Sequence, residues 1–235
     1  MAEHGTVKRG ELIVLEGAEG VGKTTQAGRL VAELTRGGVR CVHLREPGGT
    51  SLGEAVRSIL LSPAQTRTAR AEALLFMASR AQLVSEKIQP ALEAGDVVVL
   101  DRFFLSTYAY QIHGRGLPEN EIRAANQLAV GALVPTVTLV LHLPENDGLA
   151  RAGKRSGHDY MEQLGGEFHD RVGHAFDEFV TPGWQSRHPE CGPIVRVDAS
   201  GSADDVFSRM VAAISNHAPQ LGAELIGTLE QEVAK

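Results

Sequence analysis

Short apolar runs alternate along the chain with longer segments of helical periodicity. The runs 12–15, 39–44, 97–100, 137–143 and 194–197 have the length and mainly apolar character of strands, and 97–100 is apolar throughout, as a strand covered on both faces should be. In the segments between them, apolar residues recur every three or four positions, which predicts helices over 23–36, 51–61, 69–88, about 118–131 and 203–214. This alternation predicts an α/β fold of three layers, in which helices flank a five-stranded parallel sheet.

Capping residues and prolines indicate where several of these elements begin or end. Ser51–Glu54 resembles a capping box, and Pro90 should kink or restart the long helix that begins near Ala69. Pro144 and Glu145 should open a further helix. The helical spacing of apolar residues ends in a glycine-rich stretch, about 151–166, which we expect to be a mobile lid loop.

The last third of the chain carries one clear apolar stripe and one weak segment. The stripe has helical spacing and is best interpreted as core or subunit contact rather than a ligand site; it consists of Phe168, Val172, Ala175, Phe176, Phe179 and Val180. The tail 217–235 has weak helical character, so we expect it to pack loosely. Without internal repeats or a long linker, residues 1–235 are expected to form a single domain.

Composition narrows the range of partners and compartments. The chain has 23 basic and 29 acidic residues among 235, a net charge of −6, which gives no general attraction to nucleic acid or membranes. Its two cysteines form no Cys-x-x-Cys motif, and the first ten residues lack the apolar core of a signal peptide. No run of about 18 apolar residues occurs. We therefore expect a cytoplasmic protein.

The loop after the first apolar run has the pattern G-x-x-x-x-G-K-[ST], between a strand and a helix. Its glycines allow successive N–H groups to point inward, and the helix N-terminus favours the phosphates of a nucleotide. Lys23 would reach the β and γ phosphates and Thr24 would bind Mg²⁺. The alternative is a glycine-rich turn without function. The expected phosphate cradle comprises Gly17, Ala18, Glu19, Gly20, Val21, Gly22, Lys23, Thr24 and Thr25.

A second chemical feature, Asp101-Arg102, follows the third apolar run directly. Because the carboxyl ends of parallel strands line the cleft in this architecture, Asp101 is placed to hold Mg²⁺, directly or through water. Arg102 would present its planar fork to a phosphate at the same rim. The alternative is a surface ion pair at the end of a strand.

The ordered motifs resemble those of the bacterial thymidylate kinases over about residues 11–215. They are Gly17–Thr24, Arg45–Thr50, Phe76 with Arg80, Asp101–Ser106 with Ala109–Gln111, and the glycine-rich loop. The resemblance implies a P-loop kinase that transfers the γ-phosphoryl group of ATP to deoxythymidine monophosphate (dTMP), with Mg²⁺ and as a homodimer.

Individual roles follow from the resemblance at matching positions. It implies that Glu19 contacts the 3′-hydroxyl of dTMP, that Phe76 stacks on thymine and that Arg80 donates to thymine O4. It places Arg45 and Arg102 around the acceptor phosphate, with Arg57 as a weaker candidate, and it gives Tyr110 the discrimination against a ribose 2′-hydroxyl. The monophosphate pocket would be lined by Ser106, Thr107, Tyr110 and Gln111.

The reaction needs cations more than it needs a general base. A phosphate acceptor has a second pKa of about 6 and is already an anionic nucleophile near neutral pH. Charge on the moving group must be offset, yet the cradle carries no arginine at positions 18, 20 or 21. Arg151, Lys154 and Arg155 of the lid are then the candidates, and our hypothesis favours Arg155. Here the sequence departs from the family, because Asp159 precedes Tyr160 where many relatives have Asp-Arg.

Two other classes of protein can be weighed against this interpretation. A kinase for another nucleoside monophosphate is the nearest alternative, although the cradle lacks the Gly-Pro of adenylate-type kinases. A phosphate-loop switch or partition protein is a different class. The Asn-Lys-x-Asp guanine motif is absent, and so is a second lysine early in the cradle. Both absences favour the kinase.

Overall fold

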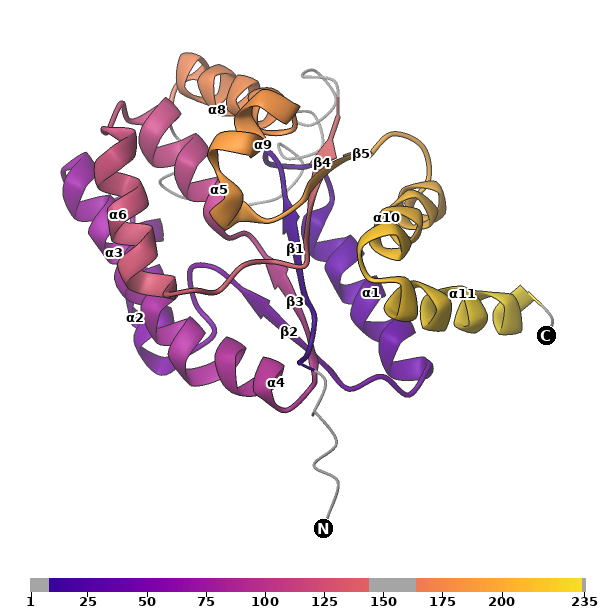
Figure 1. Cartoon of the computed structure of the whole chain (residues 1–235). Helices are drawn as coiled ribbons and strands as arrows, with labels where there is room; N and C mark the ends of the chain where they lie inside the picture. Colours follow the sequence, from indigo (N-terminus) through magenta and orange to yellow (C-terminus); the bar gives the residue numbers. More distant parts are fainter. Residues whose placement is uncertain (1–8, 144–163, 234–235) are drawn as a thin grey trace, which may run out of the picture.

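Five parallel strands form the centre of the protein, for which a computed structural model describes residues 9–143 and 164–233 (Figure 1). The strand order is β2-β3-β1-β4-β5, so β1 lies in the middle of the sheet. Every neighbouring pair is parallel. The strands are β1 (Leu12–Glu16), β2 (Cys41–Arg45), β3 (Val97–Asp101), β4 (Val137–His142) and β5 (Ile194–Asp198).

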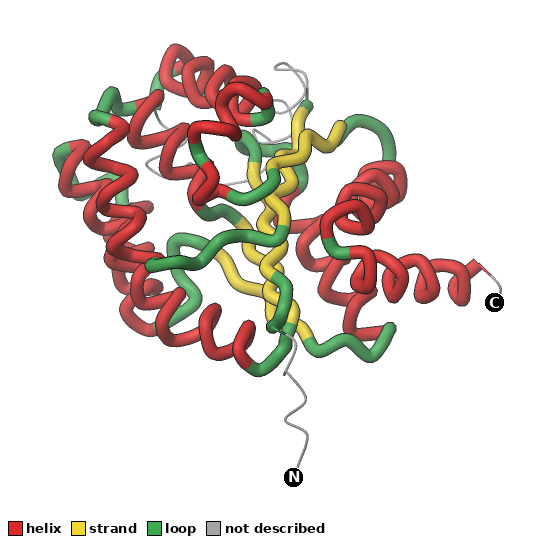
Figure 2. The backbone as a smooth tube through the Cα atoms, in the orientation of Figure 1, coloured by secondary structure: helices red, strands yellow, loops and turns green. Residues whose placement is uncertain are grey.

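Helices cover both faces of the sheet and make the three layers visible in Figure 2. One face carries α1 (Lys23–Arg36), α10 (Ala203–His217) and α11 (Pro219–Val233). The other face carries α2 (Ser51–Leu61), α3 (Ala69–Leu83), α4 (Gln89–Glu93), α5 (Phe104–Thr107), α6 (Glu119–Val130), α8 (Gly166–Phe179) and α9 (Pro182–Arg187). The predicted fold class is confirmed.

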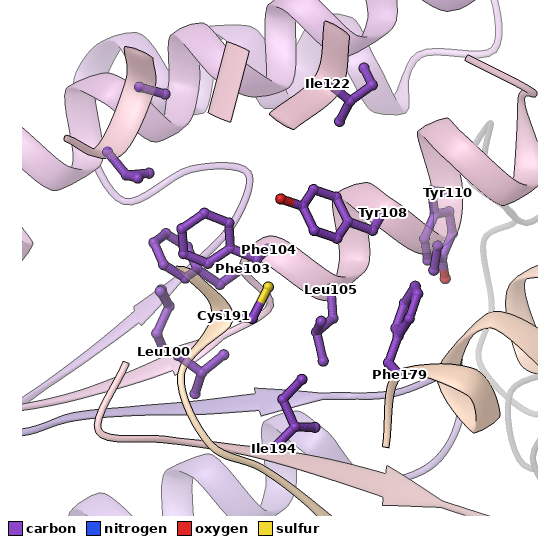
Figure 3. Packing of buried hydrophobic residues seen from close by; sticks show 14 of the residues in the cluster. Leu100, Phe103, Phe104, Leu105, Tyr108, Tyr110, Ile122, Phe179, Cys191 and Ile194 are labelled. Atoms are coloured by element: carbon purple, nitrogen blue, oxygen red, sulfur yellow. The ribbon is translucent and has the colours of Figure 1, made fainter. Parts of the chain in front are cut away.

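Each face of the sheet has its own hydrophobic core. Side chains alternate along β1, so that Leu12 and Val14 join one core whereas Ile13 and Leu15 join the other. Figure 3 shows part of the larger core, where aromatic residues from the segment after β3 pack over the sheet. Burial on both faces explains why β1 and β3 are apolar up to their last residue, whereas the edge strands β2 and β5 carry exposed side chains such as His43 and Arg196.

Two helix starts differ in detail from the sequence-based expectation. The N-cap of α2 is Thr50 rather than Ser51, because the Thr50 hydroxyl accepts the Gly53 N–H at 2.9 Å. The expected restart at Pro90 takes place inside a continuous helical segment: a π-helical turn, Val84–Ile88, joins α3 to α4, and Pro90 lies in the first turn of α4.

The C-terminal segment contradicts the expectation of loose packing. Residues 219–233 form α11, which packs against α1 and α10. Leu221, Leu225 and Thr228 are buried along one face, with Leu225 fully covered. Gly222 and Gly227 dilute this apolar pattern in the sequence, although Gly222 is needed for close contact with Ser215 of α10.

Other expectations have mixed outcomes. The stripe from Phe168 to Phe179 is buried in the core on α8, as predicted. The sequence pattern missed α5, the π-helical segment Tyr108–Gly114 that follows it, and α9, since these short elements carry no clear helical period. The helix expected at Pro144 and most of the expected lid lie outside the described residues. Within the described part of the chain, no helix has the length and apolar character to span a membrane.

Candidate active site

A cavity of about 640 Å³ opens at the carboxyl ends of β1, β2 and β3. The glycine-rich loop after β1 forms one wall, through Glu19, Gly20, Gly22, Lys23 and Thr24. Asp101 and Arg102, at the end of β3, form another. The sheet order therefore brings together the two features that the sequence singled out, because β1 and β3 are adjacent.

The loop backbone at Gly17 and Gly22 has conformations that suit glycine. Gly17 has φ of 131°, and a Cβ there would lie 2.3 Å from the carbonyl oxygen of Leu141. Gly22 has φ of 97° and immediately precedes α1, whose N-terminus receives no side-chain cap in the described structure. Because the first N–H groups of a helix lack partners within the helix, this terminus is suited to bind an anion.

Lys23 is buried beneath the loop, with 7% of its surface exposed. Its Nζ donates to the carbonyl oxygens of Gly17 at 3.0 Å and Ala18 at 2.6 Å. The pKa of the Lys23 ammonium is lowered to about 7, first by burial and then by the nearby positive charge of Arg102, against the opposing effect of Asp101. A phosphate group in the cavity would favour the charged form.

Thr24 and Asp101 are in direct contact at the floor of the cavity. The Thr24 hydroxyl donates to Asp101 Oδ2 at 2.7 Å, and both residues line the cavity. A hydroxyl and a carboxylate are hard oxygen ligands that fit Mg²⁺. Since the described residues contain no cluster of three or more side chains able to hold a metal, the other ligands would come from nucleotide and water.

Glu16 is a site residue that the sequence analysis missed. It ends β1, is fully buried, and accepts the backbone N–H groups of Phe103 at 2.7 Å and Ser106 at 3.0 Å. The Ser106 hydroxyl donates to Glu16 at 2.6 Å and accepts from Arg102 at 3.0 Å. Because a hydroxyl has one proton to donate, Ser106 acts here as an acceptor that positions Arg102.

Two further arginines border the cavity on the side of β2 and α2. Arg45 is half exposed and pairs with Glu54 at 3.2 Å, whereas Arg57 donates to the carbonyl oxygen of Pro47 at 2.9 Å. Glu54 also accepts the Gly49 N–H at 2.8 Å, which lowers the pKa of its carboxyl group together with the Arg45 charge. Both arginines are thus in position to meet an anion.

A smaller cavity of about 110 Å³ adjoins the first one and shares Glu19, Glu46, Arg57 and Arg102 with it. Apart from Pro47 and Leu61, its other lining residues come from α3 and from the segment after β3. They include the remaining residues expected to contact the monophosphate: Phe76, Arg80, Ser106, Thr107, Tyr110 and Gln111. The structure therefore brings these predicted substrate residues together in one place.

Arg80 is buried, with 1% of its surface exposed, and is not a solvated charge. Its Nε donates to Glu46 Oε2 at 2.8 Å, Nη2 donates to the carbonyl oxygen of Phe103 at 2.8 Å, and Nη1 donates to Asn126. Burial raises the pKa of the Glu46 carboxyl group, and the Arg80 guanidinium opposes that rise. Glu46 and Asn126 are positioning residues that the sequence analysis did not identify.

Tyr110 lines the smaller cavity and is hydrogen-bonded to the glycine-rich loop. Its hydroxyl donates to Glu19 at 3.2 Å, and burial raises the pKa of the phenol, so that it remains a donor. The Arg102 guanidinium lies 5.3 Å from the centre of the Tyr110 ring. Phe76 is half-buried at the edge of the larger core, as an aromatic ring that covers a cavity would be.

Some predicted site residues lie elsewhere. Ala18 and Val21 border a third hollow, against α8, and Thr25 is exposed on α1 without lining either cavity. The lid cations Arg151, Lys154 and Arg155 lie outside the described residues, so their expected role is untested.

Comparisons with known proteins identify the family. The family model described as thymidylate kinase matches residues 15–188, which is more than half of the chain. The chain belongs to the thymidylate kinase family. A thymidylate kinase of Synechococcus sp. (strain JA-2-3B'a(2-13)) is 46% identical over 207 residues, which cover 88% of this chain and 95% of that protein. A thymidylate kinase of Deinococcus radiodurans is 41% identical over 209 residues, which cover 89% and 98%.

The fold of this thymidylate kinase family member also agrees with a solved structure. The crystal structure of thymidylate kinase from Ehrlichia chaffeensis superposes with a TM-score of 0.68 at 28% identity, covering 88% of this chain and 98% of the other. The family resemblance read from the motifs, and with it the assignment as a kinase, is confirmed.

Proposed function

We propose that the protein transfers the γ-phosphoryl group of ATP to dTMP, giving ADP and deoxythymidine diphosphate. The observation that carries this proposal is the pair of adjoining cavities. One is bordered by the phosphate cradle, and the other is lined by aromatic and polar side chains that suit a nucleotide base. Arg102 and Glu19 lie in the wall that both cavities share. Donor and acceptor phosphates would meet there, which family membership alone does not specify.

On the donor side, the helix N-terminus of α1 and Lys23 would hold the β and γ phosphates. Lys23 already points into the turn of the loop, where its present acceptors are the Gly17 and Ala18 carbonyl oxygens. Mg²⁺ bound by Thr24 and Asp101 would offset the charge that develops on the transferred group. No general base is assigned, since the acceptor phosphate is itself an anion.

On the acceptor side, Arg45 and Arg102 would hold the dTMP phosphate, and Glu19 would contact the 3′-hydroxyl. Phe76 would stack on thymine, a contact of about 1–3 kcal/mol in proteins that stack bases. Tyr110, held by Glu19, would close the sugar site against a 2′-hydroxyl. Support for these roles comes from the shared lining of the two cavities.

A coupled assay with Mg-ATP tests the proposal. Initial rates are measured with dTMP and, in parallel, with deoxyuridine, deoxycytidine and deoxyadenosine monophosphates. We expect the highest kcat/KM with dTMP. ATP hydrolysis without formation of deoxythymidine diphosphate would refute the proposal, and a preference for the adenosine acceptor would favour the adenylate-type alternative. Replacement of Mg²⁺ by EDTA should abolish transfer.

We also propose that the protein is a cytoplasmic homodimer. Leu74 of α3 and Leu128 of α6 are 64% and 89% exposed, and these helices pack side by side on the outer surface (Figure 1). Exposed leucines on adjacent helices suit a contact between copies. Sedimentation velocity should give a dimer for the wild type and a monomer for Leu128→Asp. A monomeric wild type at micromolar concentration would contradict the proposal.

A further inference from the structure

Two polar side chains that line the smaller cavity, Arg80 and Gln111, differ in the hydrogen bonds that they can make. Arg80 can only donate hydrogen bonds, and among the described residues Glu46, Asn126 and the Phe103 carbonyl oxygen take four of its five N–H groups, which leaves one N–H of Nη1. Gln111 also lines the cavity, and its amide could in principle present either a donor or an acceptor. Which of the two Gln111 presents decides which base the cavity matches.

Glu72 settles the orientation of that amide. The Gln111 Nε2 donates to Glu72 Oε1 at 3.1 Å. A carboxylate accepts and does not donate, so the reversed amide would set two oxygen atoms against each other in a buried contact. Both residues are 1% exposed, and water cannot relieve such a clash. The amide nitrogen is therefore committed to Glu72, whatever ligand is present.

Glu72 is itself held in place. Arg115 donates to both of its oxygens, from Nε at 3.1 Å and from Nη2 at 2.8 Å, and Arg67 Nε lies 3.7 Å away. Glu72 belongs to α3, one turn before Phe76, whereas Gln111 and Arg115 belong to the segment after β3. The carboxylate thus fixes the amide across two elements that both line the cavity.

The oxygen of Gln111 has no hydrogen-bond donor of its own among the described residues. The side-chain oxygens that are both fully covered and without a partner belong to Gln26, Glu33, Asp96 and Asp177, so Oε1 of Gln111 is not fully covered. Gln111 lines the smaller cavity, and we therefore place this oxygen on the cavity side. The cavity presents an arginine donor and an amide acceptor together.

We infer that Glu72 is a specificity-determining positioning residue, which orients Gln111 so that its oxygen accepts the ring N–H of an imide base. This inference rests on the proposed function. Thymine and uracil present a keto oxygen beside a ring N–H, which matches the Arg80 donor and the Gln111 acceptor. Cytosine presents an amino group beside a ring nitrogen acceptor, so both contacts would be mismatched. The device excludes deoxycytidine monophosphate and does not distinguish dTMP from deoxyuridine monophosphate.

The test compares kcat/KM for dTMP and for deoxycytidine monophosphate in Glu72→Gln. A neutral amide at position 72 can accept or donate, so Gln111 can turn over. The ratio of the two kcat/KM values should fall at least tenfold, about 1.4 kcal/mol of discrimination. Glu72→Asp keeps a carboxylate and should retain the wild-type ratio within about threefold, even if kcat falls. Arg115→Lys, which alters an ion pair of Glu72 and leaves the carboxylate in place, should also retain the wild-type ratio.

Two outcomes would overturn the inference: an unchanged ratio in folded Glu72→Gln, or a ratio lost equally in Glu72→Gln and Arg115→Lys. If Glu72→Gln does not fold, judged by circular dichroism, Glu72→Gln/Arg115→Gln replaces it, since the arginine that donates to both oxygens of Glu72 is then not left without its carboxylate. A wild type that phosphorylates no pyrimidine monophosphate would instead refute the proposed function. A wild type selective for dTMP with an unchanged ratio in the variants would refute only the inference.

Discussion

Replacing Lys23 with methionine should abolish phosphoryl transfer and change the pH dependence of stability. Lys23 is 7% exposed, and burial lowers its pKa from 10.5 to about 7. Each pKa unit corresponds to about 1.4 kcal/mol, so the charged side chain opposes folding by up to about 5 kcal/mol below pH 7. Methionine has a similar length and no charge, which removes this term, although the Gly17 and Ala18 carbonyl oxygens lose a donor.

The sign follows from proton counts. Between pH 7 and pH 10.5 the unfolded chain holds a proton on Lys23 and the folded chain does not, so the free energy of unfolding of the wild type rises with pH in that window. The variant lacks this rise. Its stability advantage over the wild type should therefore shrink by about 3 kcal/mol between pH 6 and pH 9. The lost hydrogen bonds add an offset that does not change with pH.

Urea unfolding without nucleotide measures this difference, with fluorescence of the single tryptophan, the buried Trp184, as the signal. Lys87→Met, at an exposed position, controls for the loss of a lysine as such. A stability difference between Lys23→Met and the wild type that stays constant within about 1 kcal/mol from pH 6 to pH 9 would refute the argument that Lys23 is a strongly desolvated ammonium.

Three other changes test separate parts of the site. Arg80→Met leaves the buried Glu46 carboxylate without its main partner and should lower the free energy of unfolding by about 3–5 kcal/mol in urea titrations. Gly17→Ala should abolish nucleotide binding in calorimetry, because its Cβ would lie 2.3 Å from a backbone oxygen, whereas Gly28→Ala on α1 meets nothing and should stabilise the protein by up to about 1 kcal/mol. Arg155→Ala should reduce turnover at least about tenfold; a smaller loss would remove it from the transition-state role.

The sheet could be predicted because its strands carry their own signal. The apolar strands β1 and β3 and most of β4 are buried on both faces, and the boundaries of all five strands lie within two residues of the predicted ones. The C-terminal helix α11 could not be predicted in the same way. Its buried face, through Leu221 and Leu225, depends on contact with α1 and α10 rather than on a local pattern.

The residues of the candidate site likewise fall into those with a local sequence signal and those that only long-range contacts identify. The glycine-rich loop and Asp101 are local motifs at strand ends, and the sequence indicates them directly. Glu16 has the same kind of signal, an acidic residue at the end of a buried strand, and could have been found by it. The contacts of Glu46 with Arg80 and of Glu72 with Gln111 join residues 34 and 39 positions apart. No local pattern carries such contacts, so only the structure identifies these carboxylates.

The cations of the site are held by protein acceptors before any substrate is considered. Lys23 donates to two backbone carbonyl oxygens, Arg102 to the Ser106 hydroxyl and Arg45 to Glu54. The carbonyl and hydroxyl are neutral acceptors, whereas an anionic phosphate oxygen adds direct Coulomb attraction to the hydrogen bond from a cationic donor. A substrate phosphate can therefore replace the acceptors of Lys23 and Arg102 without a large movement of either side chain. This fixed arrangement supplies the electrostatic preorganisation that transfer between two anions requires.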